Sequence, residues 1–261
     1  MTWRCTARFL TRIWNRLVWL AVAMAPLHAV AEIRYATAPV DGTTIVDARS
    51  QADCLQGSLP GARCLPSSSL VGGDGQLIGA KALLWRLGTL GLSGAEQVLV
   101  VGEDATDRDM VGAVLYLAGM PKVSVLLRPV SRLVAEAPGQ VPGAVRSAVF
   151  SAPMRDKQLV FARDVREALR AEEAAPVVVD GRPEQAYWAG HLPGGQPLPL
   201  DTLRRSLGQA VPAVLPPREP IIAYGAGPRD GLALFTLLAA TGSDVRVYAG
   251  GWRDWTRSGR H

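Results

Sequence analysis

The chain has 261 residues, of which 48% are hydrophobic and 20% are charged, a composition typical of a globular protein and not of a disordered or fibrous one. Its length fits one large domain or two small ones. The formal net charge is +5, but the basic residues form no block interleaved with aromatic residues, so the sequence gives no indication of nucleic-acid binding.

The first 31 residues have the three parts of a secretory signal peptide. The segment carries four arginines and no acidic residue, residues 17–27 form an apolar run too short to span a membrane, and Ala29 and Ala31 provide the small side chains of a cleavage site. Removing these four from the 28 basic residues leaves 24 against 23 acidic ones. We expect cleavage before Glu32, export to a bacterial periplasm, and no stable membrane insertion of the cleaved chain. An uncleaved membrane anchor is the alternative.

Residues 32–134 alternate short apolar runs with helical patterns. An apolar run at 43–46 ends in Asp47-Ala48-Arg49, and a turn-rich segment at 57–62 follows. Further along come a helical pattern at 79–90, a strand at 97–101, an acidic loop at 102–107, a helix at 110–117 and a strand at 122–127. Strands that alternate with such helices predict a mainly parallel sheet covered on both faces. The segment 135–153, rich in Pro, Gly, Ala and Ser, is the expected linker.

Residues 154–261 repeat this order of elements. A strand-like start at 160–163 leads into a helix, and the strand at 177–179 ends in Asp180-Gly181-Arg182. A segment containing His191 and Pro193-Gly194 then takes the place of 57–62. The rest of the chain reads as a short helix near 201–207, a strand at 221–224, a loop at 225–231 opening a helix, a strand at 245–248 and Gly250-Gly251-Trp252.

The two ordered copies resemble the rhodanese-like domains of sulfurtransferases. That family's pattern is a strand, Asp-x-Arg, a short helix, Gly-His-Ile-Pro-Gly-Ala, a loop opened by Tyr-Cys, a helix, a strand and a Gly-Gly…Trp ending. The resemblance covers nearly all of the chain after the leader. It implies an α/β fold with two rhodanese-like domains, residues 32–134 and 154–261, each a mainly parallel sheet with helices on both faces. Some other doubly wound α/β domain is the alternative.

The loop at 225–231 departs from the family in its chemistry. In active rhodaneses a cysteine thiolate in this loop carries the transferred sulfur. Here the residue after Tyr224 is Gly225. The loop is one residue shorter than the family's usual distance from cysteine to arginine, so it can be aligned in two ways, and neither places a cysteine in it. The acidic loop at 102–107 of the first copy also lacks one. We therefore assign no catalytic residue.

The same loop keeps features of an anion-binding site. Gly225, Ala226, Gly227 and Arg229 lie at the start of the predicted helix, where backbone N–H groups and a guanidinium attract sulfate, phosphate or a carboxylate. The alternative is a degenerate turn with Arg229 in solvent or paired with Asp230. A dinucleotide fingerprint would need a glycine at position 230, so no nucleotide is indicated, and we predict no cofactor.

Four charged residues and one histidine are expected to be structural. Asp47, Arg49, Asp180 and Arg182 lie where a buried strand meets a loop, so each Asp should bond with its Arg and with nearby backbone. His191 is expected to fix its turn through a hydrogen bond. A role as catalytic base or metal ligand is the alternative, but no second ligand stands at metal-site spacing, and we predict no metal.

Two cysteines, Cys54 and Cys64, remain once the leader is removed. An even pair in an oxidising compartment favours a disulfide. A pair that exchanges electrons is the alternative, although nine residues separate the two cysteines, unlike the C-x-x-C spacing of redox motifs.

These features together predict a non-catalytic binding or scaffold protein of the periplasm. Its ligand at the degenerate loop would be a small anion or an unidentified periplasmic protein. The alternative is a thiosulfate-type sulfurtransferase that works with an unusual residue or with a partner's thiol in place of the loop cysteine.

Overall fold

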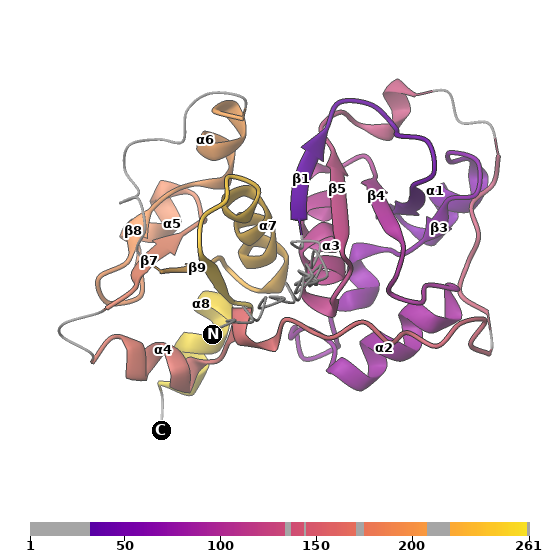
Figure 1. Cartoon of the computed structure of the whole chain (residues 1–261). Helices are drawn as coiled ribbons and strands as arrows, with labels where there is room; N and C mark the ends of the chain where they lie inside the picture. Colours follow the sequence, from indigo (N-terminus) through magenta and orange to yellow (C-terminus); the bar gives the residue numbers. More distant parts are fainter. Residues whose placement is uncertain (1–31, 134–136, 144, 171–174, 208–219, 260–261) are drawn as a thin grey trace, which may run out of the picture.

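The computed structural model describes residues 32–133, 137–143, 145–170, 175–207 and 220–259 (Figure 1). These residues form two five-stranded sheets flanked by helices, with parallel pairing throughout, which confirms the predicted fold class. The predicted leader, residues 1–31, lies outside the described residues. Among the helices that are described, none is both long and apolar enough to cross a membrane.

The first sheet belongs to residues 32–133, called here the first half, and has the strand order β1-β5-β4-β2-β3. Its strands are β1 (Glu32–Ala36), β2 (Thr44–Asp47), β3 (Arg63–Cys64), β4 (Gln97–Val101) and β5 (Lys122–Leu126). Its helices are α1 (Gln51–Gln56), α2 (Ala80–Thr89) and α3 (Ala105–Ala118), with 3-10 turns at Ser67–Leu70 and Val130–Arg132. Because both faces of β4 are covered, the strand reads as one continuous apolar run.

The second sheet belongs to residues 159–259, the second half, and has the order β6-β10-β9-β7-β8. Its strands are β6 (Leu159–Val160), β7 (Val177–Asp180), β8 (Gln196–Pro197), β9 (Ile221–Tyr224) and β10 (Val245–Tyr248). Its helices are α4 (Ala162–Ala168), α5 (Glu184–Trp188), α6 (Leu200–Arg205), α7 (Pro228–Ala239) and α8 (Gly251–Ser258). Along β9, Ile221 and Ala223 face the core shared with α7, whereas Ile222 and Tyr224 pack beside residues of α4 and α8.

Several elements differ from the sequence-based expectation. Helix α3 begins at Ala105, before the predicted 110, because the Asp104 side chain accepts a hydrogen bond from the Asp107 amide and caps the helix. Strand β1, which was not predicted, pairs with β5 along its whole length. Helix α8 follows directly from Gly250, where only a Gly-Gly-Trp ending was expected.

The two halves pack through their longest helices. Figure 1 shows α3 and α7 side by side between the two sheets. The rings of Tyr116 and Phe235 lie 5.9 Å apart, and the Thr236 hydroxyl donates to the Asp109 carbonyl over 2.8 Å. Buried residues of both helices belong to one hydrophobic core. The interface is therefore continuous with the interior of both sheets.

Residues 137–143 and 145–158, called here the connecting segment, run along the first half before they reach β6. Gly139 donates to the Cys54 carbonyl, Ser147 to that of Gly88, and Arg155 to that of Leu117. A last 3-10 turn, Asp156–Gln158, leads into the second sheet. The predicted linker, 135–153, thus contacts the first half over most of its described length.

Candidate functional site

The candidate site lies at the carboxyl end of β9, where a short loop enters α7. The helix begins at Pro228, so Gly225, Ala226 and Gly227 alone connect it to the strand. Gly225 and Gly227 are buried, and Ala226 is half-buried. The loop is therefore shorter and more enclosed than the stretch 225–231 that the sequence indicated.

Gly225 has no room for a side chain. A Cβ atom built on it would lie 2.5 Å from the Cβ of Asp230 and 2.7 Å from the Gly231 nitrogen. Such distances are far inside van der Waals contact, and one of the two neighbours is backbone. A cysteine at this position would require the start of α7 to move.

Gly250 and Gly251 close the loop from the opposite side. Gly251 has a φ of +61°, which favours glycine, and a Cβ there would lie 2.5 Å from the Gly225 carbonyl oxygen. The amides of Trp252 and Arg253 donate to the carbonyls of Gly225 and Ala226. The Gly-Gly-Trp ending therefore packs directly on the loop.

Arg229 bonds to the first half. Its Nε atom donates to Asp107 over 2.7 Å and its Nη2 atom donates to Asp104, also over 2.7 Å, while Asp230 lies 4.0 Å away. The hydrogen bond to Asp107 raises the pKa of the Arg229 guanidinium. The sequence suggested a loop anion, solvent or Asp230 as partners. Instead, Arg229 pairs with the acidic residues at the start of α3. Anion binding by this loop stays a prediction.

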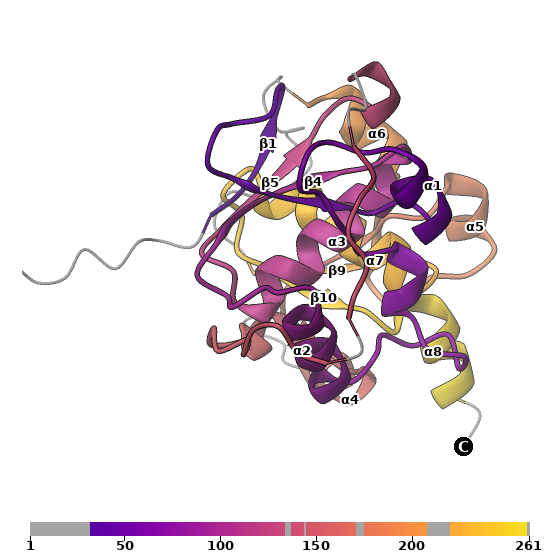
Figure 2. The same cartoon turned by 90° about the vertical axis from the view of Figure 1, so that its right-hand side faces the viewer.

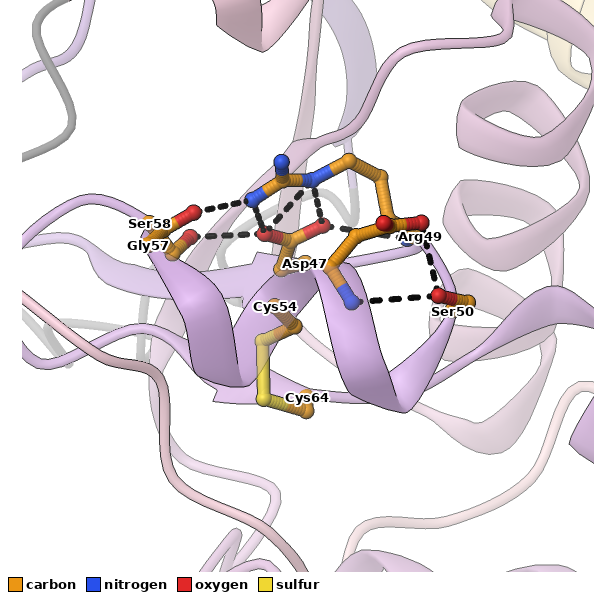
Figure 3. Close-up of a disulfide and its surroundings, with 8 residues drawn as sticks. Asp47, Arg49, Ser50, Cys54, Gly57, Ser58 and Cys64 are labelled. Carbon is orange, nitrogen blue, oxygen red and sulfur yellow. Dashed lines mark hydrogen bonds and ion pairs between the residues drawn. A yellow bond between two sulfur atoms is a disulfide. The ribbon is translucent and has the colours of Figure 1, made fainter.

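The Asp-x-Arg pair of the first half forms a closed cluster of bonds (Figure 3). Arg49 donates to both carboxylate oxygens of Asp47 and to the Gly57 carbonyl, and the Ser58 hydroxyl donates to Asp47 over 2.6 Å. Asp47 is fully buried. The oxygens of Asp47 therefore have partners within the turn, as buried polar atoms need, and the structural role of the pair stays a prediction.

The pair in the second half repeats this arrangement and adds a tyrosine. Arg182 donates to both oxygens of Asp180 and to the Gly190 carbonyl over 2.6 Å. The Tyr224 hydroxyl also donates to Asp180, and burial together with this bond raises the Tyr224 pKa. The loop-opening tyrosine of β9 is thus tied to the Asp-x-Arg turn.

His191 lies against α5. Its Nδ1 atom is 3.2 Å from the Tyr187 carbonyl, and its ring stacks on the Tyr187 ring with centroids 4.1 Å apart. The described part of the chain contains no group of His, Cys, Asp and Glu side chains suited to a metal. The contacts of His191 agree with a structural role, which stays a prediction.

An ion pair between a buried carboxylate and a half-buried arginine, which the sequence did not reveal, joins the two halves. Arg204 of α6 donates to Asp109 of α3 over 2.9 Å, and the Tyr35 hydroxyl donates to the same carboxylate. Asp109 is 2% exposed. Burial raises its pKa, against the opposing effect of Arg204. The charge of Asp109 was visible in the sequence, but its partner stands 95 residues away on an element of the other half.

A cleft of about 660 Å³ opens between the halves beside the loop. Its lining includes Thr106 of α3, Asp230 of α7, the residues that lead into α5, and residues of α6. Arg182, Arg204 and Arg205 contribute cationic side chains, Glu184, Asp201 and Asp230 contribute carboxylates, and cysteine is absent from the lining. The lining is therefore balanced in charge and offers no thiol.

Cys54 and Cys64 form a disulfide between α1 and β3, as Figure 3 shows. Both residues are fully buried. The connecting segment covers this region, since Gly139 donates to the Cys54 carbonyl and the Cys64 amide donates to that of Gln140. The bridge lies in the first half, away from the loop at Gly225.

Residues 161–258 match the family model described as "Rhodanese-like domain", a range that extends from the start of α4 to the end of α8. A search of curated protein sequences found no significant match. Solved structures share the whole architecture. A probable thiosulfate sulfurtransferase is 23% identical with a TM-score of 0.65, over 85% of this chain and 97% of the other.

Two further structures have the same fold. The 3-mercaptopyruvate sulfotransferase SseA from Escherichia coli is 21% identical with a TM-score of 0.61, over 81% of this chain and 93% of its own. Tum1 from Saccharomyces cerevisiae is 18% identical with a TM-score of 0.67, over 89% and 96%. The family match in the second half and the shared two-sheet fold support a rhodanese-like protein, related in structure to thiosulfate and mercaptopyruvate sulfurtransferases.

Proposed function

We propose that this protein is a non-catalytic rhodanese-like binding or scaffold protein. The observation that carries the proposal is the loop at Gly225. It holds glycine where active relatives hold the sulfur-carrying cysteine, and the backbone around it leaves no space for a Cβ atom. Sulfur transfer through a persulfide needs a thiolate nucleophile at the site, and this loop supplies none.

The remaining cysteines support the same conclusion. Cys54 and Cys64 are bonded to one another and fully buried. A bridged pair has no thiolate to attack a sulfur donor. An exchanging redox role would require a reductant to reach the bridge beneath the connecting segment.

The proposed compartment is the bacterial periplasm. The predicted leader supports export, and a disulfide persists most readily in an oxidising compartment. Mass spectrometry of the protein isolated from a periplasmic extract tests this: we expect a chain that begins at Glu32. A full-length chain in the membrane fraction would contradict it.

The proposed ligand at the degenerate site is a small anion or an acidic group of a partner protein. Arg205 in the cleft lining supports this, because it is exposed and bonds only to the Thr202 hydroxyl among the described contacts. The carboxylates of Asp104 and Asp107 oppose it, since they already neutralise Arg229. Binding is accordingly expected at the α6 side of the cleft.

The deciding experiment measures sulfur transfer by purified residues 32–261. Thiosulfate and 3-mercaptopyruvate would serve as donors and cyanide as acceptor, with Arg229→Ala as the comparison variant. We expect background rates for both proteins and no persulfide mass shift. Turnover that needs an added thiol and falls in the variant would favour the alternative, a sulfurtransferase that borrows a partner's thiol.

A further inference from the structure

A second cavity lies in the first half, apart from the loop and the cleft. It has a volume of about 1030 Å³ and opens between α2 and the connecting segment. In Figures 1 and 2 this segment passes alongside α2. Gly143 donates to the Thr89 carbonyl, and Ser147 and Ala148 donate to that of Gly88. The segment is thus bonded to the last turn of α2, while Lys81 and Trp85 in its earlier turns stay exposed.

The charged residues that line this cavity all have the same sign. They are Lys81 and Arg86 from α2 and Arg146 from the connecting segment, and no carboxylate is among the lining residues. A concave surface with charges of one sign and low-dielectric walls concentrates the electric field and attracts counter-charged groups. The cavity therefore favours ligands that carry carboxylates or other anions.

The cavity is also apolar and aromatic. Trp85, which is 51% exposed, and the buried Phe150 are both among its lining residues. The Arg146 guanidinium lies 4.9 Å from the centre of the Trp85 ring, a stacking that orients its donors before any ligand arrives. A ligand side chain placed on the free part of this ring would bury a large apolar surface.

The connecting segment that borders the cavity also carries exposed valines. Val141, Val145 and Val149 are 39%, 74% and 66% exposed. We call this surface, together with Lys81, Trp85, Arg86 and Arg146, the basic-aromatic groove. Exposed apolar side chains gathered near a cavity often mark interaction sites in soluble proteins. Three exposed valines along one stretch of chain fit a chain-like ligand better than a compact small molecule.

We propose that the basic-aromatic groove binds an acidic segment of a partner polypeptide. An apolar side chain of the partner packs on Trp85, and flanking carboxylates pair with Lys81, Arg86 and Arg146. A flat anionic membrane would match the charge but not the concave shape. The groove lies in the first half and the connecting segment, the loop at Gly225 lies in the second half, and the two share no residue, so the proposal holds whether or not the protein transfers sulfur.

The test uses two fluorescein-labelled pools of short peptides and residues 32–261. In one pool, Asp and Glu flank two central positions drawn from Leu, Ile, Phe and Trp; in the other, Lys and Arg replace the acids. We expect the acidic pool to bind and the basic pool not to bind, as measured by fluorescence anisotropy. Added NaCl should weaken the binding, because it screens exposed charges.

Two variants locate the binding. Trp85→Ala and Arg146→Glu should each weaken it at least about tenfold. Trp188→Ala removes another exposed tryptophan, 73% exposed on the second half, and should leave binding unchanged. Unaltered thermal unfolding of each variant shows that the fold is intact. Equal binding of both pools, insensitivity to the two groove variants, or Trp85-dependent binding to phosphatidylglycerol vesicles in place of the peptides would overturn the proposal.

Discussion

Arg229 of α7 and Asp107 of α3 join the two halves through a 2.7 Å hydrogen bond between Nε and Oδ1. The same guanidinium bonds to Asp104, the residue that caps α3. Acidic residues at the start of a helix complement its positive end, and here they also neutralise an arginine that stands at the start of another helix. Arg229, in the first turn of α7, therefore stabilises the contact between the halves.

Removing this contact should have a small effect that depends on salt. The Arg229 side chain is 47% exposed, so Arg229→Ala should lower the free energy of unfolding by about 0.5–1 kcal/mol. The loss should shrink at high NaCl, because exposed ion pairs are screened. Urea unfolding of Arg229→Ala, Asp107→Asn and the double variant measures the coupling. Strictly additive effects of the two substitutions would show that the pair contributes nothing.

The ion pair of Arg204 with the buried Asp109 should contribute much more to the free energy of unfolding than the exposed ion pair of Arg229. Arg204→Ala leaves the Asp109 carboxylate, 2% exposed, without its cationic partner, and breaking a buried pair in this way costs about 3–5 kcal/mol. Arg205→Ala is the matched control, because the neighbouring arginine bonds only to the Thr202 hydroxyl among the described contacts. Calorimetric unfolding should show a large loss for the first variant and almost none for the second. Equal losses would rule out a special role for Asp109.

A cysteine introduced at position 225 should not give the protein sulfurtransferase activity. In Gly225→Cys the new Cβ atom would collide with the backbone of Gly231, so we expect a loss of about 1–3 kcal/mol and no sulfurtransferase activity. Ala226→Cys is the control, since that position is half-buried and already bears a Cβ atom. Alkylation and unfolding curves would separate the two variants. A stable, active Gly225→Cys protein would mean that the loop opens readily.

Glu96 should give the protein part of its acid sensitivity. Although burial acts in the opposite direction, hydrogen bonds from Ser93 and Gly94 lower the Glu96 pKa. A lowered folded-state pKa stabilises the fold above the unfolded value of about 4.3, and this stability is lost as the pH falls through the folded value. The difference in unfolding free energy between the wild type and Glu96→Gln should therefore be constant near neutrality and shrink in acid. A difference independent of pH would contradict this.

The elements that were predicted best are those whose burial is visible as a pattern of apolar residues in the sequence. The strand at 97–101 coincides with β4, because a strand covered on both faces reads as an uninterrupted apolar run. Strand β1 was not predicted, because it lies at an edge of the sheet and only Ile33 of its five residues is buried. Its partner β5 lies 90 residues away along the chain.

The contacts of the candidate site also differ in how far the sequence could predict them. The bonds of Arg182 to Asp180 and Gly190 were predictable, since these partners stand within ten residues of one another, whereas the bond from Tyr224 to Asp180 spans 44 residues and was not. The contacts of Arg229 and of Arg204 were not, because both cross from one half to the other over more than 90 residues. No local pattern encodes which exposed charge will meet which after the halves pack.

The attachment of the connecting segment has a mechanical consequence. Its backbone stays bonded to the first half as far as Arg155, and Gln158 already donates to Val245 of the second sheet. The free tether between the halves is therefore much shorter than the chain that joins them. Rotation of one sheet against the other would have to separate α3 from α7, so partners should meet a nearly rigid body.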